Sequence, residues 1–241
     1  MLIKKNLIEF EVDHQTGMNG DWDFWSHVVS GAWEPNTFKV FERFLDKDHA
    51  YIDIGAWIGP TVLFGAQLSK EVFAFEPDPN AYSALRKNLS LNPLTTQNVH
   101  IFPIAISNSN GTISMGTNSK QGDSMSSMLF SKDSWQVEAA TLESMIDSLH
   151  ITDINFIKMD IEGGEKIVLP VIKNYIHKNQ PTFYLALHTT WIEDKVSFLN
   201  DVKDILSIYK NIYTSDGRKI LLDEINNLPG FTEILATNQE W

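Results

Sequence analysis

The chain has 241 residues, no cysteine and a formal net charge of −12, which comes from 31 acidic and 19 basic residues. This length suits one large α/β domain spanning residues 1–241, and the absence of cysteine excludes disulfides, thiolate metal ligands and a cysteine nucleophile. The acidic balance, without a block of Lys and Arg, argues against a nucleic-acid partner, because such a partner is held through its phosphates.

The N-terminal region predicts a small cap on that domain. Residues 2–12 alternate like an edge strand, and apolar spacing predicts a helix from residue 36 or 37 to 45, so we expect residues 1–46 to form a strand and helix cap. The start MLIKKNLIEFEV carries charges inside its apolar run, and no apolar run reaches the roughly 20 residues of a membrane span. We therefore expect a cytoplasmic protein without a membrane span.

Tryptophans and one acidic residue stand before the helix of this cap. Trp22, Trp25 and Trp33 fall within a dozen residues and indicate core or lid packing, or else a wall for a sugar or flat-ring acceptor. Glu34 precedes the helix at Pro35, so it is either a first-turn acid or a group that points into a cofactor pocket.

The stretch YIDIGAWIGP (51–60) predicts a buried strand, a glycine turn and a helix start, with the helix over 60–69. Gly55 and Gly59, with Ala56 between them, would let a ligand approach bare backbone at a helix N-terminus, and Asp53 can accept hydrogen bonds from an amine. A carboxylate there would repel a pyrophosphate, and the spacing differs from GxGxxG. The pattern favours S-adenosylmethionine as the ligand.

The second predicted strand, 72–75, ends at Glu76, which lies 23 residues beyond Asp53. An acidic residue at this point of a βαβ unit is placed to accept hydrogen bonds from a ribose diol. The alternative is a solvated residue before the prolines of EPDP. With the glycine turn upstream, we interpret Glu76 as a ribose ligand.

The next segment predicts a helix over 79–92 and a strand over 99–107, in which Pro103 indicates a bulge or an edge position. The end of this third strand would face the adenine, so Ala105, Ile106 and Ser107 are candidates by position. Residues 108–134 are rich in Ser, Asn and Gly and predict an inserted loop or lid beside the cofactor crevice.

A helix over 141–149 precedes the fourth strand, 154–159, which delivers Asp160 to the carboxyl edge of the sheet. Glu162 and Glu165 follow; they either charge the N-terminus of the next helix or, for Glu162, join Asp160 in holding Mg²⁺. The fifth strand, 182–188, ends at His188 on the same edge, where a histidine is either structural or catalytic.

A helix over 193–208 and short strands near 211–215, 219–223 and 231–236 complete the chain. This order of elements predicts an α/β fold with a Rossmann-like, doubly wound, mostly parallel sheet and an antiparallel closing strand. Helices would cover both faces, and the ligand crevice would lie beside the first strand.

The motifs YIDIGAWIG, FEPDP, TLESMIDSL and FIKMDIEGGE, in this order, resemble the FkbM family of S-adenosylmethionine-dependent methyltransferases, and GAWEP is similar to its upstream segment. The resemblance covers roughly residues 30–190 and implies a class I methyltransferase fold. By this resemblance, Asp53, Gly55 and Gly59 would hold the methionine part, Glu76 the ribose, and Asp160 would border the methyl group. Trp57 replaces the asparagine common in that turn.

The resemblance implies O-methylation of a small-molecule or glycan hydroxyl, on a sugar or a secondary metabolite. Either Asp160 or His188 would take the hydroxyl proton as the methyl group transfers, or Mg²⁺ would lower the hydroxyl pKa. Two alternatives stay open. One is a noncatalytic cofactor-binding or interaction protein on this fold. The other is an amine methyltransferase, although such an enzyme is expected to have an Asn-Pro-Pro-Tyr-like stretch where this chain has MDIEGG. The sequence indicates no oligomeric state.

Overall fold

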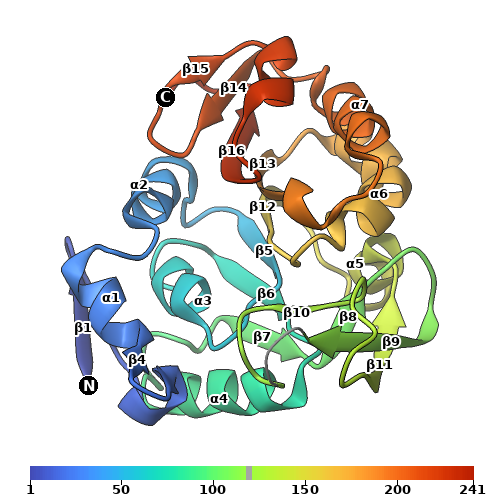
Figure 1. The fold of residues 1–241 in the computed structure, drawn as a ribbon. Coiled ribbons are helices and arrows are strands. Elements are labelled where there is room, and N and C mark those ends of the chain that lie inside the picture. The colour runs from blue at the N-terminus through green and yellow to red at the C-terminus, as the bar shows by residue number, and fades with distance from the viewer. Residues whose placement is uncertain (118–120) are drawn as a thin grey trace.

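The computed structural model describes residues 1–117 and 121–241. An eight-stranded sheet crosses the molecule in the order β15-β14-β16-β13-β12-β5-β6-β7 (Figure 1). Its strands are β5 (Ala50–Ile54), β6 (Glu71–Phe75), β7 (Val99–Phe102), β12 (Ile154–Met159), β13 (Thr182–His188), β14 (Asn211–Thr214), β15 (Lys219–Ile220) and β16 (Phe231–Thr237).

The pairing of these strands confirms the predicted fold class. β5 pairs in parallel with β6 on one side and with β12 on the other, and β7 and β13 extend the parallel set outward. β16 runs antiparallel between β13 and β14, as expected of a closing strand. Because the chain winds in opposite directions from β5, a crevice opens at the carboxyl ends of the strands beside it.

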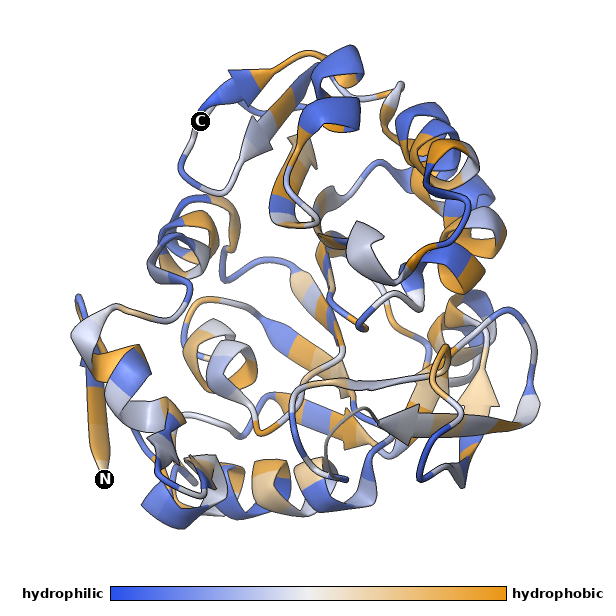
Figure 2. Ribbon diagram, viewed as in Figure 1, coloured by the Kyte–Doolittle hydropathy of each residue, from blue (hydrophilic) through white to orange (hydrophobic). Residues whose placement is uncertain are grey.

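Helices cover both faces of this sheet, and hydrophobic residues lie along the central strands and in stripes on the helices (Figure 2). Alternate residues of a buried strand serve the two layers: Tyr51 packs into one apolar cluster and Ile52 into the other. The first layer holds α1 (Phe24–Ser30), α2 (Pro35–Phe44), α3 (Pro60–Gly65) and α4 (Pro79–Ser90), and the second holds α5 (Leu142–Ser148), α6 (Glu165–Asn179) and α7 (Lys195–Leu206).

The N-terminal region differs from the predicted edge strand. Residues 2–12 form a separate antiparallel hairpin, β1 (Leu2–Lys5) with β2 (Ile8–Glu11), because Asn6 adopts a left-handed conformation, with φ of 53°, and turns the chain back. Helix α1 was not predicted, whereas α2 begins at Pro35, close to the expected start. The remaining short elements are β3 (Met18–Asn19), β4 (Trp22–Asp23) and the 3-10 helices η1 (His14–Gly17), η2 (Thr189–Trp191) and η3 (Leu222–Asn227).

Pro103 interrupts the predicted third strand and sends the chain into a second sheet. β7 stays in the eight-stranded sheet, while β8 (Ile104–Ile106) joins β9 (Gly111–Thr117), β10 (Ser126–Ser127) and β11 (Trp135–Ala140) in the order β10-β9-β11-β8. The segment 108–134, predicted as a loop or lid, therefore contains β9 and β10; its residues 118–120 lie outside the described residues. Within residues 1–117 and 121–241, no helix combines the length and apolarity that crossing a membrane requires.

Candidate functional site

A pocket of about 330 Å³ opens at the carboxyl ends of β5, β6, β12 and β13, a volume in the range of small-ligand sites. It brings together most of the side chains that the sequence singled out. The predicted residues in its wall are Glu34, Gly55, Ala56, Glu76, Ala105, Ile106, Asp160, Glu162 and His188. Asp53 and Gly59 are not among the described residues that line it.

Asp53 lies beneath the pocket and is fully buried, unlike its predicted position against the ligand. Its Oδ2 accepts hydrogen bonds from the hydroxyls of Tyr51 and Thr61, both at 2.6 Å. Its Oδ1 lies 3.2 Å from the ammonium nitrogen of Lys158. Because these donors occupy both oxygens, Asp53 supports the glycine turn from below and does not face the pocket.

The two glycines of the turn have different tasks. Gly55 has φ of +87° and lines the pocket, and a Cβ there would collide with the carbonyl oxygen of Asp160, so glycine permits the ends of β5 and β12 to meet. Gly59 has φ of +95° at the start of α3, where a Cβ would collide with the Leu85 side chain. Gly59 therefore serves the packing of α4 behind the pocket.

Glu76 stands at the end of β6, in the pocket wall, as the ribose prediction requires. Its carboxylate accepts hydrogen bonds from the backbone N–H groups of Trp57, at 2.7 Å, and Asp78, at 2.8 Å. Burial raises the Glu76 pKa to about 7, although these hydrogen bonds act in the opposite direction. Trp57, with φ of 47°, thus contributes its backbone amide to the hydrogen bonding of Glu76.

The second sheet supplies the far side of the pocket. Ala105 and Ile106 of β8 line it together with Met115 and Met128, which makes an apolar wall at the place predicted for adenine. Ser107 instead donates its backbone N–H to Ala140 O at 2.9 Å.

The segment beyond β9 also contributes to the wall, through Asp123, Ser124 and Ser126. It is held by the indole N–H of Trp57, which donates to Gly122 O at 3.2 Å, and by Asp78 Oδ2, which accepts from Gly122 N at 2.9 Å. The segment thus forms part of the pocket wall, and its interpretation as a lid stays a prediction.

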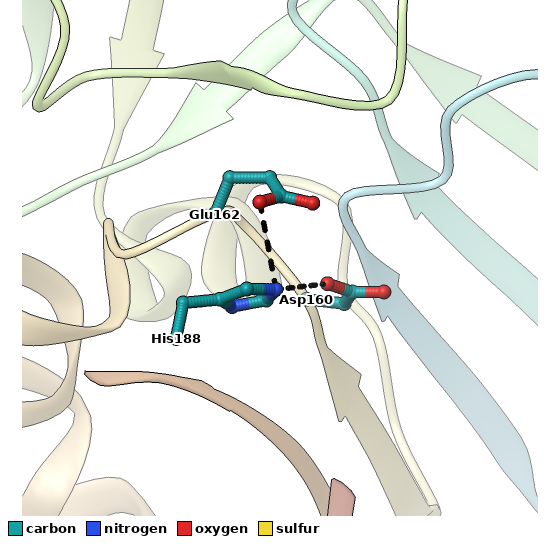
Figure 3. A group of neighbouring side chains, drawn as sticks. All are labelled: Asp160, Glu162 and His188. Atoms are coloured by element: carbon teal, nitrogen blue, oxygen red, sulfur yellow. Dashed lines mark ion pairs between the residues drawn. The ribbon is translucent and has the colours of Figure 1, made fainter. Parts of the chain in front are cut away.

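Asp160, Glu162 and His188 converge at the edge of β12 and β13 (Figure 3). His188 Nε2 lies 3.6 Å from Asp160 Oδ1 and 3.6 Å from Glu162 Oε2, while its Nδ1 lies 3.0 Å from Glu165 Oε1. Burial alone would lower the His188 pKa, but the Glu165 hydrogen bond and the surrounding carboxylates raise it to about 9. Burial raises the Glu162 pKa to about 7.

Glu34 enters the same pocket from the start of α2. It adopts a left-handed conformation, with φ of 32°, and its Oε2 accepts a hydrogen bond from Thr37 Oγ1 at 3.0 Å. Burial, together with repulsion from Asp160 and Glu233, raises the Glu34 pKa to about 8. Of the two sequence interpretations, the pocket position is therefore the one that the structure supports.

Several pocket residues escaped the sequence analysis. Lys158 is buried within β12 and lines the pocket, as do Phe231, Thr232 and Glu233 of β16. Burial would lower the Lys158 pKa, but attraction to Asp53, Asp160 and Glu34 outweighs it and raises that pKa. The sequence does indicate Lys158 as a site residue, because it stands inside the apolar run INFIKMD and a buried ammonium needs anionic partners.

The three tryptophans divide between core and pocket. Trp25 is fully buried in the core, whereas Trp22 and Trp33 line the pocket beside Phe24. Phe24 contacts Trp33 edge-on, with ring centroids 5.0 Å apart, and contacts Trp57 in the same way at 4.5 Å. The pocket thus has an aromatic wall on the side of the N-terminal cap.

The strand order, the antiparallel β16 and a pocket at the carboxyl ends of β5 and β6 define the class I S-adenosylmethionine-dependent methyltransferase fold. Residues 53–213 match the model of the methyltransferase FkbM domain, and the chain therefore belongs to the FkbM methyltransferase family. No curated protein matches the chain.

Solved structures of other methyltransferases are similar to this chain at low sequence identity. The methyltransferase FkbM from Methylobacillus flagellatus KT is 15% identical, with a TM-score of 0.52, over 83% of this chain and 50% of that one. The precorrin-6y C5,15-methyltransferase from Geobacter metallireducens GS-15 is 14% identical, with a TM-score of 0.49, over 95% and 98% of the two chains. A proposed methyltransferase from Streptococcus mutans, in complex with SAH, is 15% identical, with a TM-score of 0.46, over 83% and 94%. The chain thus spans half the length of the first of these.

Proposed function

We propose that this chain is an S-adenosylmethionine-dependent O-methyltransferase that transfers a methyl group to a hydroxyl of a sugar, a glycan or a secondary metabolite. Membership in the FkbM methyltransferase family supports S-adenosylmethionine as the methyl donor. The observation that carries the proposal is the convergence of Asp160 and His188 in the pocket that also contains Gly55 and Glu76.

The donor would lie across the ends of β5 and β6. Gly55 and Ala56 present backbone to its methionine part, Glu76 accepts from the ribose hydroxyls, and Ala105 and Ile106 contact the adenine. Asp53 acts indirectly, because it holds Lys158 and the turn in place. The sulfonium and the ammonium of the donor are cations, and the carboxylate of Asp160 in the pocket wall favours them.

Methyl transfer is an in-line displacement, in which the acceptor oxygen must stand about 3 Å from the methyl carbon and opposite the sulfur. The oxygen loses its proton as the new bond forms, so a base must be within reach. We assign this role to Asp160, because it lines the pocket at the end of β12 and its Oδ1 lies 3.6 Å from His188 Nε2.

The pocket favours a neutral acceptor. Four acidic side chains, Glu34, Asp160, Glu162 and Glu233, line it, and those that are ionised would repel a phosphate or carboxylate on the acceptor. The aromatic wall of Trp22, Phe24 and Trp33 offers flat surfaces of the kind on which sugars and rings stack. The same acidity disfavours a nucleic-acid acceptor.

The test is turnover with methyl-labelled S-adenosylmethionine and a panel of neutral, hydroxylated acceptors, with formation of S-adenosylhomocysteine as the readout. We expect Asp160→Asn to lower kcat by about 10²–10⁴-fold while S-adenosylhomocysteine still binds. Asp201→Asn, an exposed change on α7, is the matched control and should turn over normally. An Asp160→Asn variant with most of its turnover would refute the role of Asp160 as base.

The same panel separates the two alternatives. Methylation of amines but not of hydroxyls would identify an amine methyltransferase. Binding of S-adenosylhomocysteine without turnover of any acceptor would favour a noncatalytic cofactor-binding protein.

A further inference from the structure

We propose that Asp160, Glu162 and His188 form a binding site for one divalent first-row transition-metal ion, represented by Mn²⁺. Ion binding is independent of methyl transfer. Its role, to lower the pKa of the acceptor hydroxyl beside the methyl group, rests on the proposed function.

The spacing of the three side chains fits a shared ion better than direct hydrogen bonds. One ligand atom from each residue lies within 4.8 Å of the others, and His188 Nε2 is 3.6 Å from both Asp160 Oδ1 and Glu162 Oε2. A separation of 3.6 Å is too long for a hydrogen bond. Metal–ligand bonds of about 2.1 Å place neighbouring donors about 3–3.5 Å apart, so a small inward movement of the carboxylates completes the site.

The side chain of Glu165 fixes the orientation of the His188 imidazole for metal binding. Glu165 Oε1 lies 3.0 Å from His188 Nδ1, which directs Nε2 between the two carboxylates (Figure 3). A carboxylate on the far nitrogen is the usual support of a metal-binding histidine, because it fixes the tautomer and the ring. Glu165 is itself fully buried, and the same oxygen also accepts from Ile161 N at 2.9 Å, which holds it in place.

His188 Nε2, the ring nitrogen that faces Asp160 and Glu162, is available to bind a metal ion. The His188 side chain is only 8% exposed, and its Nε2 makes no hydrogen bond among the described residues. Glu162 has φ of 52°, a strained backbone conformation of the kind found at functional sites, and its Oε2 lies 3.6 Å from His188 Nε2. All three residues also line the pocket, so an ion here would keep coordination positions open to an acceptor oxygen or water.

The donor set indicates which ions suit the site. Mg²⁺, the ion expected from the sequence with Asp160 and Glu162 alone, prefers oxygen ligands and octahedral geometry. An imidazole beside two carboxylates instead suits Mn²⁺, Fe²⁺ or Zn²⁺. We therefore expect Mn²⁺ to bind more tightly than Mg²⁺.

The experiment titrates the chelator-treated chain with Mn²⁺ and follows the electron paramagnetic resonance signal of the free ion. We expect one ion per chain, together with hyperfine coupling from one coordinated nitrogen. His188→Ala should weaken binding at least tenfold and remove the nitrogen coupling. Glu165→Gln should weaken binding about 10–100-fold but keep that coupling, since its effect passes through His188.

The control is His14→Ala, which removes a histidine paired with Asp23 on the surface and should leave Mn²⁺ binding unchanged. Thermal unfolding checks that each variant is folded. If His188→Ala does not fold, Glu162→Gln takes its place, and we expect it to bind Mn²⁺ at least tenfold more weakly as well. Absence of saturable binding, or equal binding by folded His188→Ala, would overturn the site. If the chain does not bind Mn²⁺ and methyl transfer continues in excess chelator, the metal site is refuted and the proposed function is not. If the chain binds Mn²⁺ but turns over no acceptor, the proposed function is refuted and the metal site is not.

Discussion

The ammonium nitrogen of Lys158 lies 3.2 Å from Asp53 Oδ1, and both side chains are almost completely removed from solvent. The same nitrogen donates to Gly55 O at 3.1 Å and lies 3.6 Å from Asp160 Oδ2. One buried cation therefore connects the end of β5, the glycine turn and the proposed catalytic carboxylate.

The first prediction concerns this pair. Lys158→Met leaves the Asp53 carboxylate buried without its cation, so we expect the free energy of unfolding to fall by about 3–5 kcal/mol in urea titrations. The double variant Asp53→Asn/Lys158→Met should recover part of the loss. Lys173→Met is the matched control: it removes an exposed pair with Asp204 and should cost less than about 1 kcal/mol. Equal losses for the two lysines would contradict the structural importance of the buried pair.

The second prediction concerns Gly55. An Ala side chain there meets the backbone carbonyl of Asp160, which cannot move without shifting β12, so Gly55→Ala should disturb both folding and ligand binding. Gly20→Ala is the control, because Gly20 also has a positive φ, of +62°, but has nothing within 4 Å of the added Cβ. We expect Gly55→Ala to cost about 1–3 kcal/mol more than Gly20→Ala in urea unfolding and to weaken S-adenosylhomocysteine binding in calorimetry. Similar costs with unaltered binding would show that the strands do not depend on this close approach.

The third prediction is a pH dependence of stability. The folded state raises the Glu76 pKa from 4.5 to about 7 and the Glu34 pKa from 4.5 to about 8. Folding therefore favours the protonated forms, and their contribution, complete below pH 4.5, is lost as the pH rises through 7 and 8. Urea titrations of the ligand-free chain should show lower stability at pH 8 than at pH 5.

Glu76→Gln, which cannot ionise, should reduce this decrease by up to about 3 kcal/mol, whatever it does to stability at pH 5. Glu9→Gln changes a surface residue paired with Lys4 and should leave the decrease as it is. A decrease that persists in full in Glu76→Gln would mean that Glu76 is already ionised at pH 5 in the fold.

The fourth prediction concerns the segment over the pocket. Trp57→Phe keeps an aromatic contact with Phe24 but removes the indole N–H that donates to Gly122 O. Hydrogen exchange of peptides covering residues 121–128 should become faster, with a small loss of global stability of about 0.5–1.5 kcal/mol. Trp241→Phe, at an indole that packs on Tyr213, should not change exchange in these peptides. Unchanged exchange in Trp57→Phe would show that other contacts suffice to hold the segment.

Local pattern predicted most of the sheet. The runs INFIKM and TFYLALH gave β12 and β13 with their observed bounds, because strands buried on both faces are apolar without interruption. Pro103 also marked a real break, since it cannot donate to the ladder. By contrast, the alternation in residues 2–12 did not reveal that its two halves pair with each other.

The sequence predicted which residues lie at the site but not which side chains those residues contact. The ends of parallel strands share one edge, so Asp160, His188 and Glu76 were expected near one another, and they line one pocket. Asp53 was misplaced, because its cation Lys158 is 105 residues away in sequence and only the register of β5 against β12 brings them together. Glu165 was interpreted as a charge at the N-terminus of a helix, because its partner His188 lies 23 residues later in the sequence and only the fold brings the two side chains together.

The way the second sheet is attached has an evolutionary consequence. β9 runs antiparallel to β11, and Gly111 at the start of β9 stands opposite Ala139 near the end of β11. The two ends of residues 111–139 are therefore neighbours, and the hydrogen bond from Thr141 N to Asn110 Oδ1, at 2.8 Å, closes the base of this segment. A segment attached in this manner can be lengthened, shortened or exchanged between relatives while the donor crevice keeps its register. A change in this segment would thus alter one wall of the pocket and leave the strand ends that carry Gly55 and Glu76 unchanged.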